Sequence, residues 1–185
     1  MSAAPYPHSL SDIAEEFRLL DIKRRKAALS DGEREQYHSL FERLSDALAG
    51  GVRYRRMNER KFLRVPFPMT VQIRRGSTTL SAPCLNFGGG GCAILAEQFL
   101  LEEEAFIDSI EMAGETYRID SQSQICWSRH TESGGREYGL RFLLESPEVR
   151  DTVDRIFYQA LGHFINGQPN AAVAPTSKSA ASSQS

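Results

Sequence analysis

Residues 85–94 read LNFGGGGCAI, with four consecutive glycines between two short apolar runs. This pattern predicts a strand that enters a tight turn or bulge and a second strand that leaves it, because glycine has no side chain to restrict the backbone. Backbone N–H groups in such a turn can approach a phosphate or a base edge. The run is not a Walker loop, since no Gly-Lys-Ser/Thr follows, nor a dinucleotide fingerprint, since no helix is expected after it.

The sequence around the glycine run alternates between apolar and polar residues with a period of two. The alternation is found in residues 70–74, within 117–127 and in 138–142, and turn-forming residues separate these segments. About six short strands without intervening helices indicate an antiparallel barrel or sandwich. Ser146-Pro147-Glu148 then has the pattern of a helix start, and apolar residues at helical spacing continue to Phe164.

Residues 9–50 have helical periodicity in two halves. Ser30 and Glu33 have the spacing of a capping box that opens the second half, and Gly50-Gly51 is typical of a helix end. The segment is therefore predicted to form an αα-hairpin. A lone hairpin has little core, so its apolar stripe, which includes Phe17 and Leu44, must pack on the chain's own barrel or on a second protein surface. Both alternatives remain open from the sequence.

Length and composition limit the number of domains and the class of protein. The chain has 185 residues, a formal net charge of -2 and 41% hydrophobic residues, which is typical of one soluble domain with an accessory segment. No run is long and apolar enough for a membrane span, and no secretory signal is evident, so a cytoplasmic location is expected. Three cysteines without a CxxC pair are interpreted as buried thiols. Residues 166–185 are expected to be a disordered tail.

A basic segment precedes the first predicted strand. Residues 52–64, VRYRRMNERKFLR, contain six basic residues and one acidic residue. Guanidinium groups carry planar forks of donors that match phosphate oxygens and can stack on purines. On charge alone, a solvated basic connector is the favoured interpretation of the segment.

The two features together, in this order, resemble the PilZ domain family. RKFLR, residues 60–64, fits the family pattern RxxxR, and NFGGGG, residues 86–91, lines up with (D/N)xSxxG. Cys126-Trp127 and YGLRF, residues 138–142, follow at matching places. The resemblance covers residues 53–165 and implies a mainly β fold, a six-stranded antiparallel β-barrel with a C-terminal helix. It divides the chain into a hairpin at 9–50, a PilZ-like domain at 52–165 and the tail.

The resemblance implies a binding site for cyclic di-GMP. Arg60 and Arg64 match the arginines that grip the phosphates and guanines, Asn86 matches the residue that bonds a guanine edge, and Gly91 matches the last glycine of the turn. The sequence departs from the family at Gly88, where the pattern has serine. The lost hydroxyl costs about 0.5–1.5 kcal/mol, so affinity is expected to fall about tenfold rather than vanish. Gly88→Ser is expected to tighten binding if the turn keeps its shape.

Arg56 and Lys61 are possible additional ligand contacts. The expected function is a non-enzymatic receptor, without a cofactor, in which the dinucleotide orders the basic segment and changes a protein–protein surface on the hairpin. A protein partner of unknown identity or a homo-oligomer would use that surface. The alternative is a degenerate adaptor that binds proteins without nucleotide. Nucleic-acid binding is not favoured, because no groove-reading motif is present. The scattered histidines predict no metal site. The acidic residues Glu97, Glu102, Glu103, Glu104 and Asp108 are interpreted as a solvated loop between strands rather than a metal or paired-carboxylate site.

Overall fold

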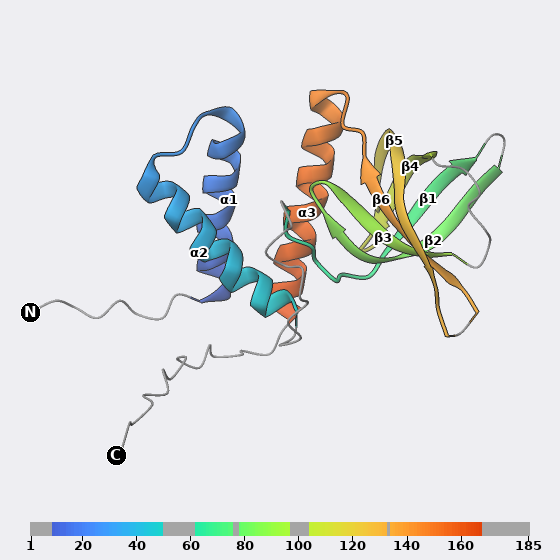
Figure 1. Ribbon diagram of the computed structural model, residues 1–185, viewed down its shortest axis with the longest axis horizontal. Coiled ribbons are helices and arrows are strands. Elements are labelled where there is room, and N and C mark those ends of the chain that lie inside the picture. The colour runs from blue at the N-terminus through green and yellow to red at the C-terminus, as the bar shows by residue number, and fades with distance from the viewer. Residues whose placement is uncertain (1–8, 50–61, 76–77, 97–103, 133, 168–185) are drawn as a thin grey trace, which may run out of the picture.

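The computed structural model describes residues 9–49, 62–75, 78–96, 104–132 and 134–167. Figure 1 shows a helical hairpin, a third helix and a β-barrel side by side. The helices are α1 (Leu10–Lys26), α2 (Asp31–Leu48) and α3 (Pro147–Gly167). The strands are β1 (Met69–Arg75), β2 (Thr78–Gly88), β3 (Gly91–Ala96), β4 (Glu104–Met112), β5 (Glu115–His130) and β6 (Arg136–Phe142).

The six strands close into an antiparallel barrel in the order β1-β2-β3-β6-β5-β4. Buried and exposed side chains alternate along the strands, because every second side chain of a strand points into the barrel. In the first half of β5 the inward residues, Tyr117, Ile119, Ser121 and Ser123, are buried while their neighbours are exposed. The predicted fold class is therefore confirmed, with the hairpin and the C-terminal helix in place.

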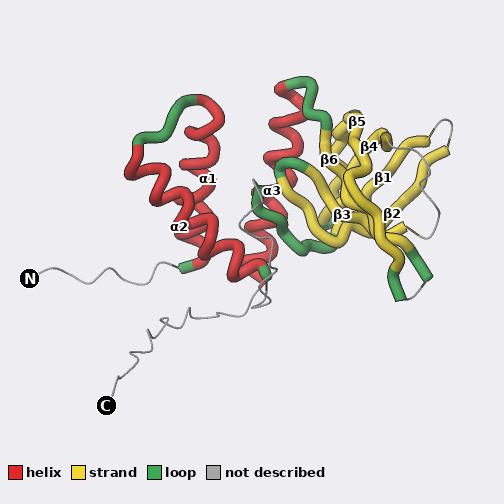
Figure 2. Tube along the Cα trace, viewed as in Figure 1, coloured by secondary structure: helices red, strands yellow, loops and turns green. Residues whose placement is uncertain are grey.

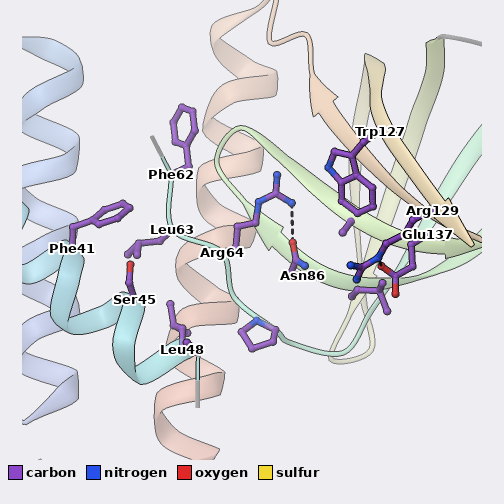
Figure 3. A pocket seen from close by; sticks show the side chains of 14 residues that line it. Phe41, Ser45, Leu48, Phe62, Leu63, Arg64, Asn86, Trp127, Arg129 and Glu137 are labelled. Carbon is purple, nitrogen blue, oxygen red and sulfur yellow. Dashed lines mark hydrogen bonds and ion pairs between the residues drawn. The ribbon is translucent and has the colours of Figure 1, made fainter. Parts of the chain in front are cut away.

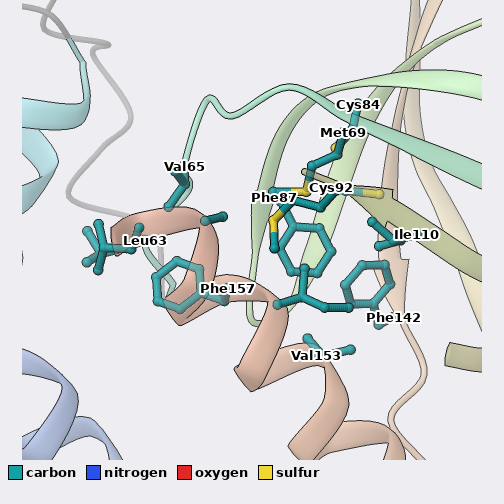
Figure 4. Packing of buried hydrophobic residues seen from close by; sticks show 14 of the residues in the cluster. Leu63, Val65, Met69, Cys84, Phe87, Cys92, Ile110, Phe142, Val153 and Phe157 are labelled. Carbon is teal, nitrogen blue, oxygen red and sulfur yellow. The ribbon is translucent and has the colours of Figure 1, made fainter. Parts of the chain in front are cut away.

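Helix α3 covers one opening of the barrel. Its first turn is capped as predicted, since the Val149 N–H donates to the Ser146 hydroxyl at 3.2 Å. Val153 and Phe157 are buried against the aromatic pair Phe87 and Phe142, whose ring centroids lie 5.5 Å apart (Figure 4). The helix runs to Gly167, two residues into the segment expected to be a tail. Residues 168–185 lie outside the described residues.

The hairpin packs on the side of α3 that faces away from the barrel (Figure 2). Both of its helices begin with a complete capping box, at Ser9 and at the predicted Ser30. Phe17 of α1 stacks on Tyr37 of α2 with ring centroids 5.1 Å apart, and both side chains are buried. The apolar stripe is thus covered within the chain, by the other hairpin helix and by α3 rather than by the barrel strands.

Two expectations for single residues were wrong. Cys84 and Cys92 are buried, but Cys126 is exposed, because the alternation along β5 turns it outward together with Gln122 and Gln124. Glu104 and Asp108, expected in an acidic loop, belong to β4, while Glu97, Glu102 and Glu103 lie outside the described residues. Within the described part of the chain, no helix is long and apolar enough to cross a membrane.

Candidate ligand-binding site

A pocket of about 500 Å³ lies between α2, the segment 62–66 and the outer face of the barrel. Figure 3 shows α2 on one side, Trp127, Arg129 and Glu137 on the other, and Arg64 and Asn86 between them. The lining residues are Phe41, Ser45, Leu48, Ala49, Phe62, Leu63, Arg64, Pro66, Leu85, Asn86, Ala93, Trp127, Arg129 and Glu137. Pockets of this size accommodate small organic ligands.

Arg64 and Asn86, predicted to act together, meet in this pocket. The Arg64 guanidinium donates to the Asn86 side-chain oxygen at 2.8 Å. A short antiparallel pairing holds the two segments side by side, since the Val65 N–H donates to the Phe87 carbonyl at 2.7 Å and the Phe87 N–H donates back at 3.0 Å. Val65 and Phe87 are fully buried. Because side chains alternate, the preceding residue of each faces outward, and Arg64 and Asn86 share the outer face.

A β-bulge turns Asn86 toward the pocket. Ala82 and Cys84 of β2 are buried, so simple alternation would place Asn86 inside the barrel as well. The pairing between β2 and β3 shifts register between Cys84 and Asn86. The extra residue in the bulge exchanges the two faces, so Phe87 points inward and Asn86 outward.

A second bulge does the same for Trp127. The pairing of β5 with β6 shifts register between Ile125 and Trp127. Without this shift Trp127 would continue the inward series of β5; with it, the indole lies on the outer face and the residue is 42% exposed. The registers then align Asn86 with Ala93, Ala93 with Gly139, and Gly139 with Trp127. Asn86, Ala93, Gly139 and Trp127 thus form a row across β2, β3, β6 and β5, with the two small residues between the amide and the indole.

Trp127 is held in place by contacts on two sides. A Cβ atom added at Gly139 would lie 2.1 Å from the Trp127 Nε1 atom, so the indole occupies the space that a side chain there would take. The Arg129 guanidinium lies 5.8 Å from the indole centroid and pairs with Glu137 at 2.5 Å. An exposed indole next to a guanidinium is a surface on which a planar base can stack.

The glycine run serves a purpose that differs from the expected one. A Cβ added at Gly88 would lie 2.3 Å from the Leu63 carbonyl oxygen, and one at Gly90 would lie 2.6 Å from the Phe62 ring. The glycines therefore allow the segment before β1 to lie directly on the turn, rather than leaving the turn backbone bare. The expected simple gain from Gly88→Ser does not fit this geometry, because serine would push Leu63, and Arg64 with it, away from β2.

A close contact between two strands requires glycine at position 91. Its φ is +153° and an added Cβ would lie 2.0 Å from the Leu140 carbonyl oxygen. It pairs with Arg141 where β3 meets β6. The residue thus maintains a close strand contact, and it does not line the pocket.

The predicted site is only partly within the described residues. Arg56, Arg60 and Lys61 lie outside them. Sequence reasoning included Trp127 in the family resemblance but gave it no role in binding, and it missed Arg129 and the whole contribution of α2. No group of three metal-ligating side chains occurs among the described residues.

The fold and the pocket define a small closed β-barrel that carries its candidate site on the outside, next to the turn between β2 and β3. Residues 54–159 match the family model of the PilZ domain. This match covers more than half of the chain, and the chain therefore belongs to the PilZ domain family. No curated protein sequence matches the chain.

Solved structures show similar chains at low identity. The PilZ domain of YcgR from Escherichia coli with c-di-GMP is 17% identical, with a TM-score of 0.40 over 55% of this chain and 90% of that one. The Bacillus subtilis inhibitor of motility MotI/DgrA is 15% identical, with a TM-score of 0.45 over 54% and 49%. Borreliella burgdorferi PlzA in complex with c-di-GMP is 11% identical, with a TM-score of 0.36 over 85% and 59%.

Gly139→Ala is expected to displace the Trp127 indole. Gly139 is not among the glycines with positive φ, so the alanine backbone is tolerated and the effect comes from the clash alone. Overpacking of this kind costs about 1–3 kcal/mol. Because the chain contains one tryptophan, its fluorescence emission maximum reports the displacement directly. Gly32→Ala, where an added Cβ meets nothing within 4 Å, is the control and should leave the emission unchanged. An unaltered spectrum in Gly139→Ala would contradict the packing described.

Proposed function

We propose that this protein is a receptor for cyclic di-GMP and that the pocket between α2 and the barrel is its binding site. The observation that carries the proposal is the meeting of Arg64 and Asn86 in one pocket, at 2.8 Å from each other. Membership of the PilZ domain family supports the choice of ligand, and two of the similar structures are described as holding c-di-GMP.

Each pocket residue has a role suited to this ligand. The Arg64 guanidinium supplies charge-assisted bonds to a phosphate, with Arg60 as its expected partner from the neighbouring segment. The Asn86 amide carries both donors and an acceptor and can pair with a guanine edge. Trp127 offers a stacking face for a base, and the Arg129 guanidinium, paired with Glu137, lies beside the indole and carries further N–H donors. None of these roles requires bond making or breaking, so the proposed activity is binding.

The proposed output is a change in a protein–protein surface. Binding would draw the rest of the basic segment, residues 53–61, against the barrel beside residues 62–64, and the hairpin that precedes this segment would shift or tighten on α3. A ligand can drive such a change only through different contacts in the two states. The exposed faces of α1 and α2 are the proposed surface for a protein partner or a second copy.

Calorimetric titration of the purified protein tests the proposal. Saturable binding of cyclic di-GMP is expected, with GMP at the same concentration giving much weaker binding because it offers one base and one phosphate. Duplex DNA serves as a second control, since a general phosphate binder would take up DNA and lose it steeply with added salt. Absence of binding at millimolar cyclic di-GMP would overturn the proposal.

A degenerate adaptor is the second candidate, and one observation favours it. Phe62 and the Leu63 carbonyl lie against the glycine turn, and Gly88 lacks the hydroxyl of the family pattern. In an adaptor this packing would be permanent and the hairpin would bind its partner without nucleotide. The same titration separates the two candidates.

A further inference from the structure

Helix α2 forms a wall of the pocket, although it lies outside the 54–159 match to the PilZ domain. Its lining residues, Phe41, Ser45 and Leu48, follow one another at spacings of four and three, so they occupy one side of the helix, and the C-cap residue Ala49 completes the wall. Ser45 and Leu48 are 7% and 9% exposed. A ligand between Trp127 and this wall would touch the hairpin as well as the barrel (Figure 3).

The hairpin is held on α3 by a compact polar cluster, here called the clasp, which consists of Asp21 and Arg25 from α1 with Asp154 and Tyr158 from α3. The Tyr158 hydroxyl donates to the Asp21 carboxylate at 2.7 Å. The Arg25 guanidinium donates to both Asp21 and Asp154. Asp21 is 3% exposed, and it also accepts the Tyr37 hydroxyl of α2 at 3.1 Å. One buried carboxylate thus joins all three helices.

The clasp holds two carboxylates and one guanidinium, and Arg24, which donates to Asp21 at 2.9 Å, supplies the second positive charge. Burial alone would raise the pKa of Asp21, but the hydrogen bond from Tyr158 and the charges of Arg25 and Arg24 outweigh it and lower the pKa. For Asp154 burial prevails, and repulsion from Asp21 adds to it, so its pKa is raised despite the contact with Arg25. Removing one partner from such a cluster leaves a buried charge uncompensated, which is strongly unfavourable. We therefore expect docking of the hairpin on α3 to require all four residues of the clasp.

The clasp also lies beside the turn that opens β3. A Cβ added at Gly89 would be 3.8 Å from the Arg25 Nη2 atom and 3.8 Å from the Asp154 Oδ1 atom. The hairpin consequently contacts the site region twice, through the clasp at the glycine turn and through α2 at the pocket.

We propose that the hairpin completes the dinucleotide site and that the clasp sets how fully the site is formed. This inference rests on the proposed receptor function. If ligand contacts α2 in the docked state, then loosening the clasp must weaken ligand binding, and ligand must strengthen docking by the same factor. A clasp residue that never touches the ligand then acts as a positioning residue for it.

Asp154→Lys tests the proposal by placing a second positive charge against Arg25. Cyclic di-GMP affinity is expected to fall about tenfold, within the usual range of coupling between sites. Hydrogen exchange of residues 10–48 should become faster while the barrel strands keep their protection. The matched control is Asp151→Lys, the same change at an exposed position one turn earlier on α3. The control should leave both readouts within twofold of the wild type.

Tyr158→Phe provides a gentler variant that leaves the Arg25–Asp154 contact beside the glycine turn intact. Its matched control is Tyr117→Phe, which removes a tyrosine–carboxylate hydrogen bond to Glu115 on β5. Affinity should fall in Tyr158→Phe by about two- to fivefold and not in the control. Faster exchange in the hairpin with unchanged affinity in both clasp variants would overturn the inference and leave the receptor function standing. A wild-type protein that does not bind would overturn both.

Discussion

Replacing Arg64 with alanine is expected to weaken cyclic di-GMP binding by about 10- to 150-fold, the equivalent of one charge-assisted hydrogen bond worth roughly 1.5–3 kcal/mol. Arg64 is half-buried and bonded to Asn86, so it is held in place before the ligand arrives. A side chain that is already ordered contributes more to affinity than a mobile one, because less conformational entropy is lost on binding. Isothermal titration calorimetry measures the change directly.

Arg118→Ala is the matched control for this variant. Arg118 also lies on the barrel surface, in β5, but it pairs with Asp120 at 2.6 Å and does not line the pocket. Affinity in the control is expected to stay within twofold of the wild type. Equal losses in the two variants would mean that general positive charge, rather than this pocket, attracts the ligand. Thermal melting of both variants checks that Arg64→Ala remains folded.

Replacing Gly91 with alanine is expected to destabilise the barrel by about 3 kcal/mol or more, from backbone strain and overpacking combined. The φ of +153° disfavours an L side chain, and the added Cβ would lie 2.0 Å from the Leu140 carbonyl oxygen and 3.0 Å from its carbon. These are backbone atoms of the neighbouring strand β6, so they cannot rotate away. A fall in melting temperature of roughly 6–12 °C follows for a chain of this size.

Gly162→Ala is the control for Gly91→Ala. An alanine side chain at this position on α3 meets nothing within 4 Å. Because alanine is a better helix former, the control should stabilise the protein by about 0.5–1 kcal/mol. An unchanged melting temperature in Gly91→Ala would contradict the close contact described between β3 and β6. The expected loss would show that Gly91 maintains the close contact between β3 and β6.

Local sequence patterns predicted the helices and most of the strands, but not the first part of β4, where Glu104 and Asp108 were expected in a loop. The period of two between 70 and 144 predicted the barrel strands, because inward residues must be apolar to fill a closed barrel. The Ser30–Glu33 spacing predicted the start of α2, and the capping box is present with both of its hydrogen bonds. The Ser146-Pro147 pair predicted the start of α3.

Local sequence patterns did not predict which way the side chains of the site face. Alternation alone places both Asn86 and Trp127 inside the barrel, and each faces outward only because a bulge precedes it. A bulge depends on how two strands pair, which a single strand's sequence does not specify. Asn86 was assigned a ligand contact through the family pattern, whereas Trp127, although part of the resemblance, was given no role in binding. The wall from α2 depends on tertiary packing of the hairpin on α3, which local periodicity does not encode.

Fluorescence of Trp127 during a titration with cyclic di-GMP tests most directly whether the ligand enters this pocket. The chain contains no other tryptophan, and this one lies within the pocket lining, so the signal reports one place. We predict a saturable change in emission, with excitation above the absorption of guanine, that gives the same affinity as calorimetry and is weakened in Arg64→Ala. Calorimetric binding with no change in Trp127 emission at saturation would contradict the assignment of the ligand to this pocket.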